Sequence, residues 1–89
     1  MRRASKENFL EWIEENCDVR EGLEDTLHDL YHDYIDWNIL QHFAEASIGN
    51  WVVWMRKRFI ELARMDEFEQ DGKVHKRRFH FVGIRRKRI

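Results

Sequence analysis

Two histidines one helical turn apart, His28 and His32, have the spacing of a catalytic metal site. In the motif H-E-x-x-H both imidazoles bind zinc and the Glu acts as general base. Here Asp29 stands where that motif has Glu, and the sequence offers no obvious third ligand. By helical angle both histidines fall between an apolar and an acidic face. We therefore interpret them as a structural pair and predict no metal.

Other catalytic patterns are also missing from the sequence. There is no Gly-rich phosphate loop, and the only serines, Ser5 and Ser47, stand where helix caps are expected. Cys17 continues an apolar stripe and has mostly acidic neighbours, so we interpret it as a buried hydrophobic residue rather than a reactive thiol. The sequence predicts a non-enzymatic protein without a cofactor.

The two halves of the chain carry opposite charge. Residues 1–47 hold 12 acidic and 4 basic residues, a net charge of -8. Residues 48–89 hold 5 acidic and 12 basic residues, a net charge of +7. This asymmetry favours one surface that binds a polyanion such as nucleic acid. The alternative is that the acidic half neutralises the basic half within the molecule.

Composition predicts one folded domain over residues 1–89, with residues 1–4 and 86–89 frayed. A hydrophobic fraction of 43% and four Trp residues suit a compact core. One Cys excludes a disulfide framework within the chain and fits a reducing compartment. No apolar run is long enough to cross a membrane and no signal peptide is recognisable, so we expect a cytoplasmic protein without membrane contact.

The elements that would position a binding surface begin with two amphipathic helices. Ser5 caps the first, Lys6–Asn16, and Thr26 caps the second, Leu27–Gln41. Residues 18–25 between them form a polar link. The expected buried positions are Phe9, Leu10, Ile13, Cys17, Leu27, Leu30, Tyr31, Tyr34, Ile35 and Trp37.

A third helix is expected from the Ser47 cap to Arg64. At about 100° per residue its buried face holds Trp51, Met55, Phe59 and Leu62. Its other face holds Val53, Trp54, Lys57, Glu61 and Arg64, with Arg56 and Arg58 beside them. A helix that keeps a Trp and several cations outside its core face is expected to contact a ligand.

A β-hairpin is expected after Arg64, because Asp71-Gly72 suits a two-residue type I′ turn. That turn would pair Gln70 with Lys73, Glu67 with Lys76 and Asp66 with Arg77. Three helices followed by a hairpin predict an α+β fold of the winged helix-turn-helix class. In that class the third helix enters the major groove and the wing follows the backbone. The predicted DNA contacts are Trp54, Arg56, Lys57, Arg58 and Arg64 on the helix, Lys73, Lys76, Arg77 and Arg78 on the wing, and Arg85 and Arg86 in the tail.

Several short motifs resemble a known family. They are LYHDYIDW (Leu30 to Trp37), Ser47 followed by Trp51 and Met55, and a basic hairpin that ends in Gly83-Ile84-Arg85. Together they resemble the C-terminal winged-helix domain of phage and plasmid primase-helicases of the poxvirus type. The resemblance covers Phe9 to Arg85 and departs from the family where the link before Ser47 lacks the usual Gly. It implies a DNA-binding accessory in replication, either free-standing or part of a larger protein.

Three functions remain open at this point. The favoured one is DNA binding in the replication of a phage, plasmid or other mobile element, with a replication protein as a further partner. The second is a protein–protein module, in which the acidic helices bind a basic partner or Val53, Trp54 and Ile60 form a homodimer seam. The third is a single-strand binder that stacks bases on Trp54.

Overall fold

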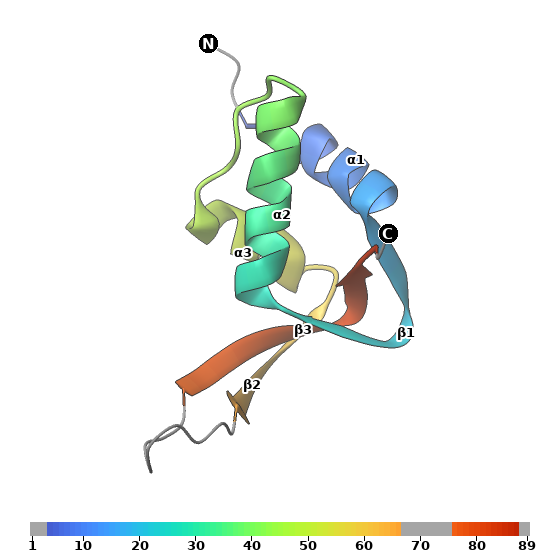
Figure 1. Cartoon of the computed structure of the whole chain (residues 1–89), viewed down its shortest axis with the longest axis vertical. Coiled ribbons are helices and arrows are strands. Elements are labelled where there is room, and N and C mark those ends of the chain that lie inside the picture. Colours follow the sequence, from blue (N-terminus) through green and yellow to red (C-terminus); the bar gives the residue numbers. More distant parts are fainter. Residues whose placement is uncertain (1–3, 67–75, 88–89) are drawn as a thin grey trace.

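The elements run helix, strand, helix, helix, strand, strand along the chain (Figure 1). The computed structural model describes residues 4–66 and 76–87. The elements are α1 (Lys6–Asn16), β1 (Cys17–Thr26), α2 (Leu27–Leu40), α3 (Ile48–Arg56), β2 (Ile60–Asp66) and β3 (Lys76–Arg86). No helix in the described residues is long and apolar enough to cross a membrane.

The three strands form one antiparallel sheet in the order β1-β3-β2. The prediction of a winged helix-turn-helix, drawn as three helices followed by a hairpin wing, is therefore wrong. The predicted polar link 18–25 belongs to β1, which lies between α1 and α2 and pairs with β3. Its sequence shows no alternation, since only Cys17 and Leu23 of its ten residues are buried. The pairing is also irregular between Val19 and Glu24, so no local period indicated a strand.

The third helix is shorter than predicted. It ends at Arg56, and residues 60–64, which were expected to be helical, belong to β2 (Ile60–Asp66). The last helical backbone bond runs from the Phe59 amide to the Met55 carbonyl at 2.8 Å. Spacing alone could not separate the two outcomes, because Ile60 and Leu62 fit a strand as well as the end of a helix. Leu62, predicted to be buried, is 40% exposed.

The register of the β2–β3 hairpin differs from the prediction by one residue. Asp66 pairs with Lys76. The predicted pairs were Asp66 with Arg77 and Glu67 with Lys76. The proposed turn at Asp71-Gly72 lies outside the described residues. Side chains alternate between the two faces of a strand. A register shift of one residue therefore places the cations of β3 on the opposite face from the one predicted.

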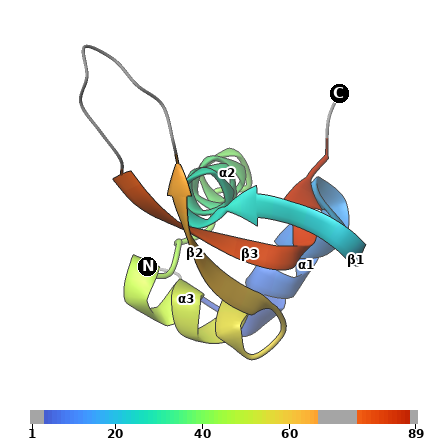
Figure 2. The same cartoon turned by 90° about the horizontal axis from the view of Figure 1, so that it is seen from below.

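The three helices lie against the sheet (Figure 2), and aromatic side chains form most of the core between them. Trp51 lies at the centre of this core, with ring centroids 6.1 Å from Trp12, 5.2 Å from Tyr31 and 5.9 Å from Phe81. Trp12, Tyr34, Trp51, Phe81 and Phe9 are fully buried. The predicted burial of Phe9, Ile13, Cys17, Leu30, Tyr34, Trp37, Trp51 and Met55 is confirmed.

The helix starts are also confirmed. The hydroxyl groups of Ser5, Thr26 and Ser47 each accept a hydrogen bond from a backbone N–H three residues later. The residue that follows the end of α2 in the left-handed conformation is not the expected Gly. His42 adopts φ 58°, the left-handed conformation that Gly usually supplies after a helix.

Candidate nucleic-acid interface

The exposed side of α3 carries a stripe formed by Asn50, Val53 and Lys57. These residues have i, i+3 and i+7 spacing, and all three are exposed, while Trp51 and Met55 on the other side are buried. An Asn amide can pair with adenine and a Lys ammonium can donate to guanine. Asn50 was not among the predicted DNA contacts. Its helical spacing from Val53 and Lys57 was the signal that could have identified it as one.

Trp54 does not lie outside the core in the way the helical angle predicted. It is half-buried and packs against the core, with its ring centroid 5.4 Å from that of Phe9. Part of the indole is therefore covered by α1, which leaves less of it for a nucleic-acid base. Its proposed contact with DNA stays a prediction.

Three of the predicted DNA-contacting arginines are engaged by carboxylates of this chain. Arg56 pairs with Glu61 at 2.9 Å, and Arg64 pairs with Glu24 at 2.7 Å. The Arg86 Nε donates to Asp25 at 2.8 Å. The alternative of intramolecular neutralisation therefore applies to Arg64 and Arg86, whose partners lie in the acidic half.

Arg86 belongs to a polar cavity at the end of β3. Hydrogen bonding to Asp25 raises the pKa of Arg86 above its ordinary value, so this guanidinium stays charged. The Nε of Arg85 is buried without a hydrogen-bond partner in the described structure. The cavity measures about 300 Å³ and is lined by Glu24, Asp25, Asp33, Arg85, Arg86 and Lys87. Its mixed charges give it no net preference for a polyanion.

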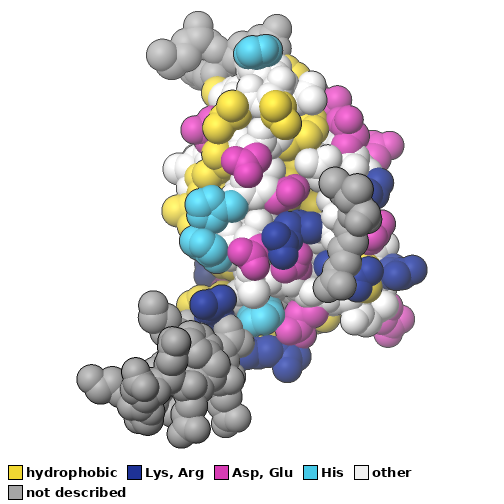
Figure 3. All heavy atoms as spheres, in the orientation of Figure 1, with side chains coloured by type: hydrophobic (Ala, Val, Ile, Leu, Met, Phe, Trp, Pro, Cys, Tyr) yellow, Lys and Arg dark blue, Asp and Glu magenta, His cyan; other side chains and the backbone are white. Residues whose placement is uncertain are grey.

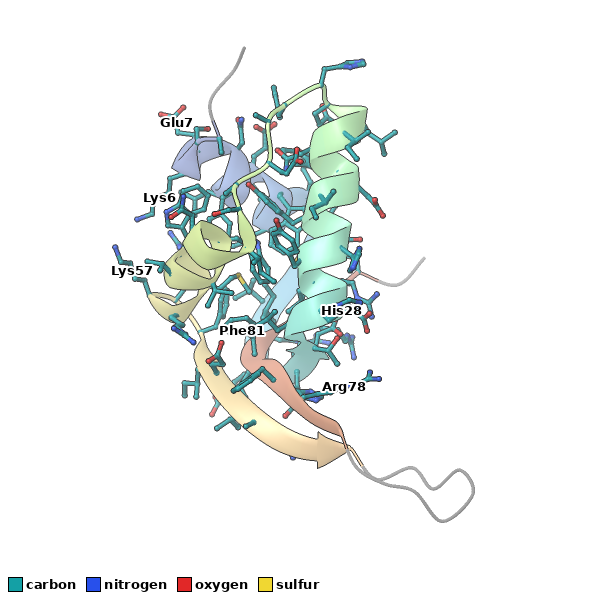
Figure 4. All side chains as sticks on the ribbon, turned by 90° about the vertical axis from the view of Figure 1, so that its left-hand side faces the viewer. Lys6, Glu7, His28, Lys57, Arg78 and Phe81 are labelled. Carbon is teal, nitrogen blue, oxygen red and sulfur yellow. The ribbon has the colours of Figure 1, made fainter. Side chains whose placement is uncertain are left out.

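Two of the predicted cations lie just past the end of α3. Lys57 and Arg58 follow α3 directly and are exposed, and neither makes an ion pair with any residue in the described part of the chain. Arg78 on β3 is also exposed. Figure 4 shows Lys57 on one side of the molecule and Arg78 on the other, so these two do not make one continuous basic patch.

The remaining predicted contacts fall on the hairpin beyond Arg78. Lys73 lies outside the described residues. The backbones of Lys76 and Arg77 belong to β3, and the structure does not describe their side chains.

Acidic side chains lie over α1 and α2 on the face seen in Figure 3. Not all of them are free for a partner. The predicted solvated row on α2 includes Asp33, whose Oδ2 accepts hydrogen bonds from the Trp12 indole at 2.9 Å and the Asn16 amide at 3.4 Å. Asp33 therefore ties α1 to α2. The acidic surface has a structural role in addition to any effect on nucleic acid.

His28 and His32 are exposed neighbours on α2. Their ring centroids lie 4.4 Å apart. No group of three or more residues of the metal-ligating types gathers anywhere in residues 4–66 and 76–87. The pair offers two ligands, fewer than a structural or catalytic zinc site uses.

No protein-family model matches the sequence, and no curated protein is significantly similar to it. The resemblance to primase-helicase domains therefore stays a prediction from the quoted motifs alone.

Proposed function

We propose that this chain is a non-enzymatic DNA-binding domain that contacts duplex DNA with the exposed side of α3. The observation that carries this proposal is the combination of the Asn50–Val53–Lys57 stripe with two exposed cations at one helix end. These cations, Lys57 and Arg58, make no ion pair with any residue that the structure describes. Base-reading side chains next to phosphate-binding cations are what a groove-binding helix requires.

Duplex DNA is favoured over single strands by the position of Trp54. Binding to single strands depends on aromatic side chains on which bases can stack. Trp54 is half-buried against Phe9 and does not project from α3 as a free platform. A role in the replication of a phage, plasmid or other mobile element rests on the sequence resemblance alone and is part of the proposal.

The test is fluorescence anisotropy with labelled duplex and single-stranded DNA at salt concentrations from about 50 to 200 mM. We expect binding to duplex that weakens linearly with the logarithm of salt concentration. Lys57→Ala and Arg58→Ala should each reduce that slope by about one, because each removes one phosphate or base contact. Asn50→Ala should lower the preference between duplex sequences and leave the slope unchanged.

Lys87→Ala is the matched control, since Lys87 is an exposed cation directly after β3 whose Nζ donates to the Glu14 carbonyl of α1. It should leave the slope unchanged. Lys76→Ala and Arg77→Ala test whether the hairpin adds contacts, at about one unit of slope each. Absence of duplex binding at low salt would contradict the proposal. A salt slope that is the same in Lys57→Ala, Arg58→Ala and the unmodified chain would contradict it as well.

A further inference from the structure

A groove crosses the sheet surface between the irregular part of β1 and the start of β2. It measures about 340 Å³ and is lined by Val19, Arg20, Glu21, Gly22, Arg58, Phe59, Ile60, Val82 and Gly83. Val19 is 54% exposed and Ile60 is 65% exposed, so the apolar lining faces solvent. Gly83 has no side chain to fill the floor. A groove of this size suits one or two apolar side chains rather than a whole helix face.

Two arginines stand at the edge of this groove. Arg20 and Arg58 are exposed and have no ion pair with any described residue, while Glu21 is the one acid that lines the groove. The groove is therefore apolar at its base and positive at its margin. It fits an apolar side chain that is accompanied by carboxylates.

The same chain presents such a segment at the end of α2. Leu40 is 77% exposed and Ile39 is 60% exposed, the first and third highest values among its exposed large hydrophobic residues. Asp36 lies one helical turn before Leu40 and is exposed. We call Asp36, Ile39 and Leu40 the α2 tip. Apolar side chains are visible at this upper end of α2 in Figure 3.

The α2 tip and the groove lie in different parts of the molecule. The C-terminal end of α2 is at the upper end in Figure 1, and β1 and the turn between α3 and β2 are in the lower half. A chain therefore cannot place its own tip in its own groove. A second copy can, and it would bring the Asp36 carboxylate to the arginines at the groove margin while covering two exposed apolar side chains.

We propose that the groove binds the α2 tip of a second copy of this chain, head to tail. Such an interface is heterologous, because each copy contributes a different surface, and it produces chains or closed rings rather than symmetric dimers. The contact is small, so the association is weak, with a dissociation constant on the order of 0.1 mM. This self-association does not require DNA and is measured without it.

Sedimentation velocity over concentrations on both sides of about 0.1 mM tests this directly. The variants avoid Arg58, which borders both the groove and the proposed DNA contact. Ile60→Ser and Arg20→Glu alter the groove, and Leu40→Ser alters the tip. Each should weaken association about tenfold or more, while circular dichroism confirms folding. Val53→Ser, at an exposed apolar position outside both surfaces, should associate like the unmodified chain.

A mixture of variants separates a head-to-tail contact from a symmetric one. Ile60→Ser retains an intact tip and Leu40→Ser retains an intact groove. Each alone should be monomeric, and their mixture should form a 1:1 complex and nothing larger. The charge-reversed pair Arg20→Glu and Asp36→Arg should associate with each other more strongly than either does with the unmodified chain.

Each other outcome contradicts the proposal. A monomer at every concentration would show that the groove does not bind a second copy. Association lost in the groove variants and unchanged in Leu40→Ser would show a different occupant. Failure of the mixture to form a complex, with both variants folded, would show a symmetric interface.

Discussion

The indole Nε1 of Trp12 donates a hydrogen bond of 2.9 Å to Oδ2 of Asp33, and this bond joins α1 to α2. Trp12 is fully buried, and Asp33 is the acceptor for its indole N–H. One carboxylate from the acidic row on α2 thus completes the aromatic core.

Asp33→Ala is expected to lower the free energy of unfolding by about 1–3 kcal/mol, because it leaves a buried donor without an acceptor. Asp33→Asn keeps an acceptor oxygen and should cost less. Asp36→Ala is the control, since Asp36 is exposed, and its effect should stay within about 0.5 kcal/mol. Urea denaturation measures all three. Equal effects for Asp33→Ala and Asp36→Ala would show that the hydrogen bond contributes little.

Trp54→Ala is expected to destabilise the protein by about 1.5–3 kcal/mol, somewhat less than the loss of a fully buried Trp. The reason is that Trp54 packs against Phe9 and the core and is not a free surface side chain. Trp54→Phe should recover part of this loss. Thermal denaturation gives the comparison, with Val53→Ala as an exposed neighbour. A neutral Trp54→Ala would restore the indole as a candidate contact surface.

Gly83 and Gly49 should respond in opposite directions to Ala. Gly83 has φ 95°, which an L side chain rarely adopts, so Gly83→Ala should cost about 1–2 kcal/mol of stability. Its new Cβ would meet Phe59 at 3.7 Å, an ordinary contact, so the cost comes from the backbone. Gly49 lies within α3 with no atom within 4 Å of an added Cβ, and Gly49→Ala should stabilise by about 0.5–1 kcal/mol. Chemical denaturation measures both changes in the free energy of unfolding. If the two changes had the same sign, this assignment would be contradicted.

Cys17 should make stability depend on alkaline pH. Burial raises the pKa of its thiol far above the ordinary value, and the charge of Asp33 acts in the same direction. The unfolded thiol ionises near pH 8.5 while the folded one stays protonated, so the unfolded state binds fewer protons above that pH. Stability is therefore complete below about pH 8.5 and falls as pH rises toward the folded pKa.

Comparison with Cys17→Ala isolates this contribution. The variant should be less stable at pH 7 by about 1–2 kcal/mol, because a buried side chain is shortened. Above about pH 8.5 the difference should shrink by up to about 1.4 kcal/mol per pH unit. Denaturation series at several pH values measure it. A difference that stays constant up to pH 10 would mean that the folded thiol ionises normally.

Local signals explain which parts of the fold could be predicted from the sequence. The caps at Ser5, Thr26 and Ser47 are correct because capping involves residues within a single turn. The burial of Trp51 and Met55 follows from helical period alone. The burial of Cys17 was anticipated in the same way, from its place in the apolar stripe.

The other parts of the fold depend on pairing between residues that are distant in sequence. β1 exists because β3 supplies its hydrogen bonds. α3 ends at Arg56, and the chain pairs with the same strand from Ile60 onward. Arg64 and Glu24 are 40 positions apart in sequence, and only the sheet brings them to 2.7 Å. The sequence by itself determined that the C-terminal half of the chain is basic and where the helices of the chain begin. The tertiary structure decided which cations are neutralised, because a charge is paired by its neighbours in space and those neighbours come from distant strands.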